Sequence, residues 1–573
     1  MTYIKFTCLN RDYSEWDLYN PNNFNKLNKI DYNINPIINK LFNQDVIEID
    51  ENNSFKKIIH SSTREMKMIP GVITFDKMYG KMNDNKYYYK VIPDDKRLPF
   101  FLTSYKREKN KFNKKNNKKY VIFTYNDWEK DHPRCKILHT IGDIKNLHNF
   151  YEYILYCKSL HASIQYFTKK TNEVLKETSE EQFISNILKK YNLEDRTQWD
   201  VITIDPKKSK DYDDGFGIKD IHYQEKECKL LSIYISNVPL WMDIMNLWDS
   251  FSNRISTIYL PDRKRPMLPT ILSDTLCSLR ENVVRFAFTI DIIINENDIL
   301  DICYCNTAIK VRKNYDYEDK KVKKDRNYIE GKKICKKITK KLNCKMVEVI
   351  NDSHDLIMFL MVLVNYLTAK KLLEYKCGIF RSIKLDLSAN IPNNLPNNIK
   401  KFLVMWNSTG GQYLKYENYD THDLLKLDAY IHITSPIRRL VDLLNILKIQ
   451  EKFGLIKMTQ NSQKFYDYWL SDERIEYINT TMRAIRKVQN NCELLNKCEK
   501  EPEILEKYYD GYIFDKIIRN DALYQYSVYI PEIHLLNKCT SRYDYENYSK
   551  RKCRIYLFDD EITFKQKILL SIE

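Results

Sequence analysis

The chain has 573 residues and a mass of 69.0 kDa, which is too long for one hydrophobic core, so we expect roughly three to four domains. Its 43% of hydrophobic residues is an ordinary globular composition and excludes a wholly disordered chain. Lys and Arg number 93 against 77 Asp and Glu, a net charge of +16, which favours a polyanionic partner. Nucleic acid is the leading partner class, and a basic surface without a ligand is the alternative.

The cysteines and the first residues give no sign of a metal framework or of export. The 14 cysteines are scattered without a CxxC pair, so the sequence predicts neither a zinc site nor a set of disulfides. The start lacks the pattern of a signal peptide, and no apolar stretch approaches the ~20 residues that a membrane span needs. We expect an intracellular, cytoplasmic protein without a membrane; no protein partner is indicated, and a monomer is compatible with the sequence.

The first 170 residues divide into two parts. Residues 1–60 are Asn-rich with a mixed pattern, and we predict neither a fold nor a function for them. Residues 61–170 hold short alternating runs such as GVITF, KYYYKVI and KYVIFTY between turn-forming segments, followed by a helical pattern. This order predicts a small antiparallel barrel of the OB-like type with a helical end.

A basic segment lies between two of these expected strands. Lys106 to Lys119 reads KREKNKFNKKNNKK, with eight basic residues and one acidic residue. Long basic loops between barrel strands commonly follow the phosphates of a nucleic acid. We therefore predict RNA contacts from four lysines: Lys114, Lys115, Lys118 and Lys119. The alternative is a solvated loop without a ligand.

The remaining elements alternate between strands and helices. A capping box of Thr178 and Glu181 predicts a helix that begins there, and strand patterns fill residues 195–310. Among them, VRFAFTIDIII, the turn-forming NEND and ILDICYC predict a hairpin. Apolar positions at helical spacing predict helices over 353–375 and 440–500. We expect residues 171–500 to form a central mixed domain, and the alternating runs of residues 501–573 to form a second OB-like barrel.

The most informative segment is VITIDPKKSKDYDDGFG, Val201 to Gly217. An apolar run ends at Asp205, and Asp211, Asp213 and Asp214 follow after a short basic loop. Four carboxylates in a small volume are unfavourable unless cations neutralise them, and hard oxygen ligands select Mg²⁺ or Mn²⁺. A calcium loop does not fit the glycine spacing; an acidic surface turn is the alternative.

This segment resembles the TIDP and KD-x-DD hallmark of the ribonuclease II / ribonuclease R family, whose catalytic domain is the RNB domain. Two further segments resemble that family in the same order. They are YLPDRKRPMLPTILSDTLCSL at 259–279 and YIHITSPIRRLVDL at 430–443. The resemblance covers about 195 to 450 well and extends more weakly in both directions.

The resemblance implies an α+β multidomain protein, with a central RNB-type catalytic domain flanked by OB-like RNA-binding barrels. It implies processive 3′→5′ hydrolysis of single-stranded RNA to nucleoside 5′-monophosphates with Mg²⁺ or Mn²⁺. Carried over residue by residue, it makes Asp205, Asp211, Asp213 and Asp214 metal ligands, and it makes Asp213, Arg438 and Tyr259 catalytic. Tyr259 and Arg438 would contact the RNA near the scissile bond.

The sequence departs from the family pattern at four places. They are Met358 with Phe359, where the family has acids; Ser236 with Asn237; Asn445 with Ile446; and the region of Gln489, where an acid that helps sense the sugar is usual. These departures leave two alternatives open: a catalytically silent RNA-binding member that acts as a complex component, and a nuclease that acts on DNA. We predict a structural role for His432. For Arg439, a surface pair with Asp442 and a contact with the ligand are equal alternatives.

Overall fold

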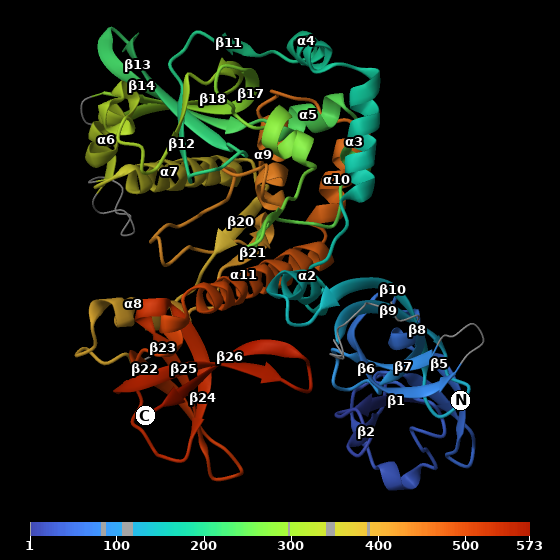
Figure 1. Ribbon diagram of the computed structural model, residues 1–573. Coiled ribbons are helices and arrows are strands. Elements are labelled where there is room, and N and C mark those ends of the chain that lie inside the picture. Colours follow the sequence, from blue (N-terminus) through green and yellow to red (C-terminus); the bar gives the residue numbers. More distant parts are fainter. Residues whose placement is uncertain (1, 82–86, 106–117, 296–297, 340–349, 387–389) are drawn as a thin grey trace, which may run out of the picture. The chain divides into compact units, whose positions relative to one another are not determined.

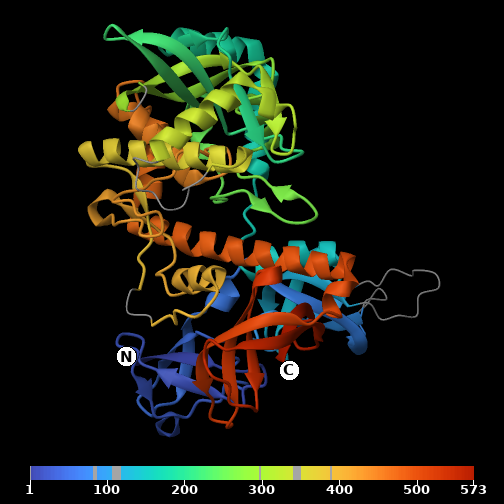
Figure 2. The ribbon, with the colours of Figure 1, turned by 90° about the vertical axis from the view of Figure 1, so that its left-hand side faces the viewer.

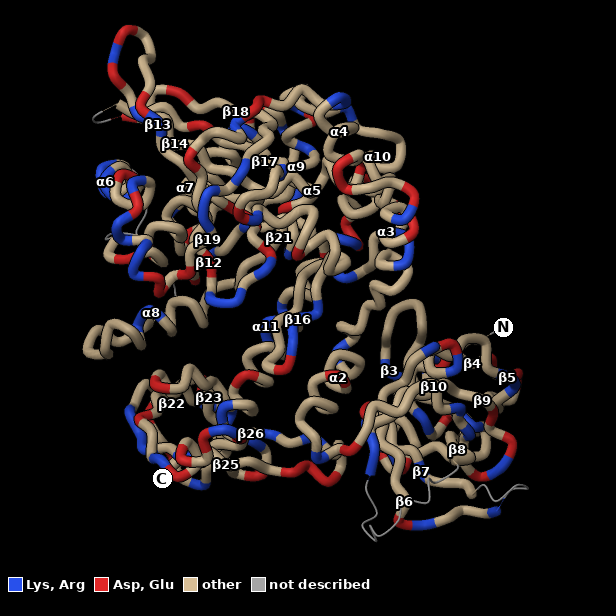
Figure 3. Tube along the Cα trace, turned by 45° about the horizontal axis from the view of Figure 1, so that its top comes forward, with Lys and Arg blue, Asp and Glu red and all other residues tan. Residues whose placement is uncertain are grey.

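The structure is a computed structural model that describes residues 2–81, 87–105, 118–295, 298–339, 350–386 and 390–573. The chain divides into two compact units (Figures 1 and 2). The first unit comprises residues 1–161, 260–262 and 488–573, and the second comprises residues 162–259 and 263–487. Lys and Arg are spread over the elements of both units (Figure 3).

Residues 1–60, for which no fold was predicted, form a five-stranded sheet in the order β3-β2-β1-β4-β5. Its strands are β1 Thr2–Cys8, β2 Trp16–Tyr19, β3 Lys26–Leu27, β4 Val46–Ile49 and β5 Phe55–His60. Ile4, Phe6 and Cys8 alternate along β1 and are all buried. This period of two was present in the sequence, and it places one face of the strand in a core.

The predicted OB-like region contains a closed barrel in the order β10-β8-β7-β6-β9, which confirms the barrel. The strands are β6 Ile69–Lys81, β7 Tyr87–Pro93, β8 Phe101–Tyr105, β9 Lys119–Asp127 and β10 Arg134–Asp143. The short helix α1 Ser62–Glu65 precedes the barrel, and α2 Leu147–Cys157 follows it. Apolar residues of the barrel and of the first sheet share one core, since Phe42 stacks on Phe101.

The C-terminal strands form a sheet in the order β24-β23-β22-β25-β26. They are β22 Tyr509–Ile518, β23 Tyr524–Ile530, β24 Leu535–Ser541, β25 Lys550–Asp560 and β26 Lys565–Ile572. Within residues 501–573, all of which are described, no backbone ladder joins β24 to β26; instead the Asn537 side-chain amide donates to the Ile568 carbonyl at 2.8 Å. Here the expected barrel is an incompletely closed sheet.

Within the first unit, the C-terminal sheet contacts the N-terminal barrel. The Tyr120 hydroxyl of β9 donates to the Phe564 carbonyl at 2.7 Å, and Lys565 forms an ion pair of 2.5 Å with Asp94. The turn between β25 and β26 is therefore fixed to the N-terminal barrel by one hydrogen bond and one ion pair.

The second unit is built on a seven-stranded sheet in the order β11-β18-β17-β14-β13-β12-β19. Its strands are β11 Glu194–Arg196, β12 Ile202–Asp205, β13 Asp214–Tyr223, β14 Lys226–Ser236, β17 Val284–Ile294, β18 Ile299–Lys310 and β19 Lys313–Asp316. The predicted hairpin is confirmed as the antiparallel pair of β17 and β18. Figure 1 shows α6 Arg326–Thr339 and α7 Ser353–Glu374 beside this sheet, and their apolar side chains share a core with β12, β13, β14 and β17.

Smaller elements complete this unit. They are α3 Gln165–Glu177, α4 Glu180–Lys190, α5 Val238–Ile244, β15 Ile258–Tyr259, β16 Lys264–Arg265, β20 Ile379–Ser382, α8 Asn397–Trp406, β21 Gln412–Lys415, α9 Leu440–Lys452, α10 Gln460–Leu470 and α11 Asp472–Lys500, whose last turns belong to the first unit. The predicted capping box is wrong by one residue. Thr178 ends α3, and Ser179 caps α4 by accepting from the backbone N–H of Gln182 at 3.3 Å.

Among the described residues, one helix is long and apolar enough to cross a membrane by length and composition. This helix is α7, so the expectation that no stretch approaches that length is wrong. Within α7, 67% of the most apolar stretch is buried inside the protein, and Leu356, Leu360 and Leu363 are fully buried. Burial of this kind is typical of a core helix.

Candidate functional site

The sheet brings the first and last aspartates of the motif to one edge. Asp205 is the last residue of β12 and Asp214 the first of β13, and the two strands are antiparallel neighbours. The glycines of DDGFG permit the close approach: a Cβ at Gly215 would lie 2.9 Å from the Ile202 carbonyl, and one at Gly217 would lie 2.4 Å from that of Asp200. The glycines are therefore required by packing and not only by a turn.

Asp213 is buried and held from two sides. Its Oδ1 accepts from the backbone N–H of Ile437 at 2.8 Å, and its Oδ2 accepts from Arg438 Nε at 3.1 Å. Burial raises the pKa of this carboxyl to about 7, although the Arg438 charge and the Ile437 N–H act to lower it. The SPIRR segment thus comes to the aspartates, as the sequence predicted, through Arg438.

Asp211 is positioned by the hairpin of β15 and β16. Its Oδ1 accepts from Lys264 Nζ at 2.9 Å, and its Oδ2 accepts from the Tyr259 hydroxyl at 3.3 Å. Lys264 also donates to Asp274 at 2.8 Å. Tyr259 remains 43% exposed, so part of its ring is open to a ligand. Sequence reasoning missed Lys264, although it lies within the YLPD block.

Among the described residues, no ion pair with Lys or Arg is found for Asp205 or Asp214, in contrast to Asp211 and Asp213. Burial, followed by the charge of Asp214, raises the pKa of Asp205 well above its usual range. Burial also raises the pKa of Asp214 to about 6, opposed by the charges of Arg438 and Arg439. The Oδ2 atom of Asp205 is buried, and no hydrogen-bond partner for it is found among the described residues. Buried, unpaired carboxylate oxygens of this kind fit a hard divalent cation.

A tighter group of ligand atoms lies elsewhere in the sheet. Glu194, Asp291 and Cys305 each offer one ligand atom within 4.8 Å of the others. Arg196 already neutralises them, because its guanidinium donates to Asp291 at 2.6 Å and to Glu194 at 2.6 Å. Arginine thus takes the place that a cation would need in this cluster.

Two aromatic residues beside the aspartates were not predicted. Burial, with the charges of Asp214 and Asp205, raises the pKa of Tyr317, which places its hydroxyl in the electrostatic field of the cluster. The ring of His354, from the first turn of α7, stacks on Tyr317 with centroids 3.8 Å apart. The backbone N–H of Tyr317 donates to the Asp205 carbonyl at 3.1 Å. No local pattern in the sequence indicates this pair, because its two members lie far apart along the chain: Ser353, which donates to the Tyr317 carbonyl, comes 36 residues after Tyr317.

Several departures from the family pattern prove to be packing residues. The side-chain amide of Asn237 donates to Asn306 at 2.9 Å and to Gln450 at 3.1 Å, all three buried. Asn445 bonds both backbone groups of Ile379 at 2.9 Å. On α7 the two replaced acids differ in environment: Phe359 is buried in the core and Met358 is 38% exposed. Gln489 lies on α11 in the first unit.

The predicted structural roles of His432 and Arg439 are visible. His432 Nδ1 and the Tyr413 hydroxyl are 2.8 Å apart, and burial lowers the pKa of His432 well below its usual range. Arg439 donates to Asp442 at 2.8 Å; this pair was expected at the surface, but Asp442 is fully buried.

The basic loop is only partly described. Lys114 and Lys115 lie outside the described residues. The Lys118 ammonium lies 4.4 Å from the centre of the Phe564 ring, and that of Lys119 lies 5.9 Å from the Tyr105 ring. Both lysines belong to the first unit, so their role toward RNA stays a prediction.

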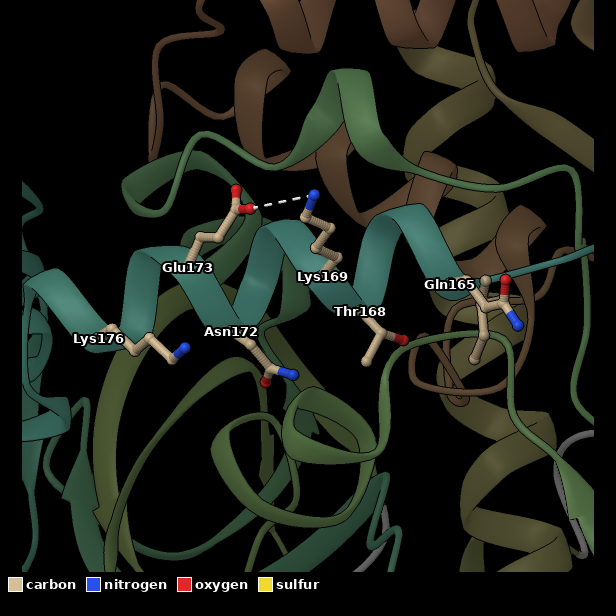
Figure 4. Close-up of a pocket in the computed structure, with 7 residues that line it drawn as sticks. Gln165, Thr168, Lys169, Asn172, Glu173 and Lys176 are labelled. Atoms are coloured by element: carbon tan, nitrogen blue, oxygen red, sulfur yellow. Dashed lines mark ion pairs between the residues drawn. The ribbon is translucent and has the colours of Figure 1, made fainter.

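A hollow of the second unit does not coincide with the aspartates. It measures about 490 Å³ along α3, with Gln165, Thr168, Lys169 and Asn172 in its lining (Figure 4). Lys169 and Glu173 form an ion pair of 3.9 Å across one turn. The hollow contains none of the predicted site residues.

Comparison with known proteins identifies the class. Residues 193–332, which include all four aspartates, match the RNB domain, and residues 88–158 match the Dis3-like cold-shock domain 2. The chain therefore carries an RNB domain and an OB-type cold-shock domain, as the resemblance implied.

Several of the similar curated proteins are ribonuclease R proteins. Ribonuclease R of Chlamydia pneumoniae is 25% identical over 380 residues, which is 54% of each chain. The structure of Mycoplasma genitalium RNase R in complex with ribose methylated single-stranded RNA covers 99% of this chain and 100% of that one, with a TM-score of 0.67 at 16% identity. Yeast Ssd1, a pseudonuclease, covers 94% of this chain and 78% of its own, with a TM-score of 0.56 at 12% identity. The chain is thus related to the RNB-family exoribonucleases, and its curated relatives match over about half of their own length or less.

Proposed function

We propose that this protein is a metal-dependent 3′→5′ exoribonuclease that acts processively on single-stranded RNA and releases nucleoside 5′-monophosphates. One observation carries the proposal: Asp205 and Asp214 are half-buried and adjacent, the Asp205 Oδ2 atom is fully buried, and neither has a cationic partner at hydrogen-bond distance among the described residues, inside a segment that matches the RNB domain. A purely structural pair of buried acids would be expected to have bonded cations.

The four aspartates have different tasks in this proposal. Asp205 and Asp214 would hold Mg²⁺ or Mn²⁺, which when bound supplies an activated water and a Lewis acid for phosphodiester hydrolysis. Asp211 is held by Lys264 and Tyr259 and turns these two side chains toward the same edge of the sheet. Asp213 orients Arg438 through its Nε, which leaves the remaining guanidinium N–H groups to donate to a phosphate.

The nucleotide at the RNA 3′ end would lie between Tyr259 and the pair of Tyr317 with His354. Tyr259 is 43% exposed, and the other two rings are stacked beside the acids. Stacking on aromatic rings is tolerant of base identity, so little sequence specificity is expected. The four lysines of the basic loop would add phosphate contacts farther along the strand.

A silent RNA-binding member is the second candidate. The exposed Met358 and the buried Phe359, where the family has acids, favour it, and the fold is shared with the pseudonuclease Ssd1. Against it, the four aspartates, Arg438 and Tyr259 are all present and brought together within the second unit. A third candidate, a nuclease for DNA, would use the same acids.

The test is the digestion of 5′-labelled single-stranded RNA with and without Mg²⁺. We expect a descending ladder or a labelled end product of a few nucleotides, because the last stacked bases are lost at about 1–3 kcal/mol each and dissociation then overtakes hydrolysis. A 3′-phosphate should block the reaction. Labelled mononucleotide as the first product, or equal cleavage of circular RNA, would exclude an exonuclease of this direction.

Two comparisons separate the alternatives. A DNA oligomer of the same sequence distinguishes a ribonuclease from a DNA-directed nuclease. Tight binding without turnover in either Mg²⁺ or Mn²⁺ would identify a silent member.

A further inference from the structure

Arg381, on β20 in the second unit, is a buried arginine without an acidic partner. Arg381 is only 9% exposed, and its guanidinium carbon lies 4.8 Å from the centre of the Tyr413 ring. Gly411 closes the other side: a Cβ there would lie 1.9 Å from Arg381 Nη2. The guanidinium therefore occupies the space in which any other residue at position 411 would place its side chain.

Other positive charges surround Arg381. Burial lowers its pKa, and the charges of Arg486 and Arg439 lower it further. Asp442 compensates Arg439 at 2.8 Å, but no ion pair is found for Arg381 or Arg486 among the described residues. The Arg381 charge also helps burial to lower the pKa of His422 to about 4. The cluster of Arg381 and Arg486 thus has an excess of positive charge.

The position of Arg486 follows from α11. Asn479 bonds both backbone groups of Tyr413, with distances of 2.7 and 2.9 Å. Arg486 lies seven residues later, two helical turns along the same face, and its charge acts on Arg381. Arg486 is exposed, so the cluster opens to solvent at this end.

The cluster is connected to the candidate site by one segment. The Arg381 N–H donates to the Tyr430 carbonyl at 2.7 Å, and Phe380 forms a β-bridge with Ile431. Eight residues after Tyr430, the same segment presents Arg438 to Asp213. Arg381 is therefore bonded to the segment that carries Arg438.

We propose that Arg381 and Arg486 bind one phosphate of the RNA backbone, adjacent to the phosphate gripped by Arg438. The inference rests on the proposed function, because it takes the polyanion to be RNA. A planar guanidinium donates two parallel N–H groups to a phosphate, and a half-enclosed site strengthens those hydrogen bonds. The phosphate would supply the negative charge that the protein itself does not place there.

The test measures RNA affinity in the Asp213→Asn protein, so that turnover does not interfere. Arg486→Gln removes an exposed charge without disturbing the core, and Lys487→Gln removes the same charge from the adjacent residue, about 100° around α11. We expect Arg486→Gln to weaken binding about 10-fold and to flatten the plot of log affinity against log salt by about 0.7. Lys487→Gln should change either quantity much less.

A second variant tests the buried arginine without changing any charge. Gly411→Ala adds a methyl group where Arg381 Nη2 lies, so it should displace the guanidinium and weaken RNA binding by a similar factor. Thermal unfolding checks that this protein is folded. Unchanged affinity in both Arg486→Gln and folded Gly411→Ala would overturn the proposal.

The source of the phosphate is tested with the RNA itself. A single uncharged methylphosphonate is moved along the oligomer from the 3′ end. At one position it should weaken binding to the Asp213→Asn protein, and at that position it should have little further effect on the affinity of the protein that also carries Arg486→Gln. If no position has this effect, and if inorganic phosphate competes with RNA for the protein but not for Arg486→Gln, the cluster binds a free anion and the RNA assignment is overturned. Failure of the proposed function is separate: it appears as an absence of turnover by the unsubstituted protein in Mg²⁺.

Discussion

Two buried arginines of the second unit, Arg196 and Arg381, show opposite ways of placing a charge in a protein. Arg196 donates to both oxygens of Asp291, at 2.8 and 2.6 Å, and to Glu194 at 2.6 Å. Ser232 completes this network by donating to Asp291 at 2.6 Å. Arg381 lies against Tyr413 and Gly411 and has no acidic partner among the described residues.

The acids of the sheet divide in the same way. Asp291 is paired with Arg196. Asp205, by contrast, has a buried oxygen for which no hydrogen-bond partner is found among the described residues, and after burial it is the charge of Asp214 that raises its pKa most. A buried charge that is fully paired needs nothing from outside, and one that is not paired is stabilised by a ligand of opposite sign. This contrast separates the structural cluster around Arg196 from the clusters that we assign to metal and to RNA.

The largest expected effect comes from Asp213, in the aspartate cluster that we assign to metal. Asp213→Asn should abolish hydrolysis while RNA affinity changes less than about 10-fold, because the amide keeps the shape but removes the negative charge beside the metal ligands. Initial rates on labelled RNA and filter binding in Mg²⁺ measure the two quantities. Activity near that of the unsubstituted protein would contradict the assignment of this site.

The paired cluster should show the reverse behaviour. Asp291→Asn leaves the Arg196 guanidinium buried with less compensation, so we expect the free energy of unfolding to fall by about 3–5 kcal/mol. Turnover per folded molecule should remain close to that of the unsubstituted protein. Denaturant titration and rate measurements at low temperature check both halves; a lost turnover with intact stability would make Asp291 a functional acid.

The sequence predicted the local groups better than their environments. The four aspartates, Arg438 and Tyr259 were predicted because their spacing along the chain is short or lies in a recognisable block, and their roles stay predictions. Lys264 was within such a block and was overlooked, since a lysine three residues after a Pro-Asp turn has no feature of its own. The pairing of Tyr317 with His354 depends on α7 packing against the sheet, which no local pattern encodes.

The fold shows the same division. Alternating runs predicted the closed barrel and the β17–β18 hairpin because their period of two is strong. The sheet of residues 1–60 was missed although β1 alternates, since Asn-rich connections conceal its short strands. The C-terminal sheet was expected to close, but closure depends on which groups meet between β24 and β26, and there a side-chain amide replaces a backbone ladder.

A smaller effect is expected in the stability of the metal-free protein. The pKa values of Asp213 and Asp214 are raised to about 7 and about 6, against an ordinary value near 3.9 for an unfolded chain. Protonation of these two carboxyls stabilises the metal-free fold. This contribution to the free energy of unfolding is fully present below about pH 4, and it is lost as the pH rises through 6 to 7. Mg²⁺ should therefore raise the melting temperature more at pH 8 than at pH 5.5.

The matched control is Asp214→Asn, which removes one of the titrating groups. Its melting temperature should depend less on pH between 5.5 and 8, and it should gain less from Mg²⁺. Equal gains at both pH values for the unsubstituted protein would show that these acids do not couple protons to metal binding.

The smallest expected effect concerns the basic loop of the first unit, which provides a contrast with the enclosed arginine site. Ser at the four positions 114, 115, 118 and 119 should flatten the slope of log affinity against log salt by up to ~3 units, since each phosphate contact with a single strand contributes about 0.7. The lysine pairs differ: Lys118 and Lys119 already lie near aromatic rings, so their ammonium groups are partly engaged. Replacing Lys114 and Lys115 alone should therefore produce at least half of the change.

The basic loop and the arginine cluster should also differ at high salt. Loop lysines contribute mainly through released counterions, so the effect of their replacement should vanish at high salt. The loss of affinity caused by Arg486→Gln should persist in part because Arg381 is enclosed. A slope that does not change in the fourfold variant would assign the loop to solvent and leave the arginine cluster as the main phosphate contact outside the candidate site.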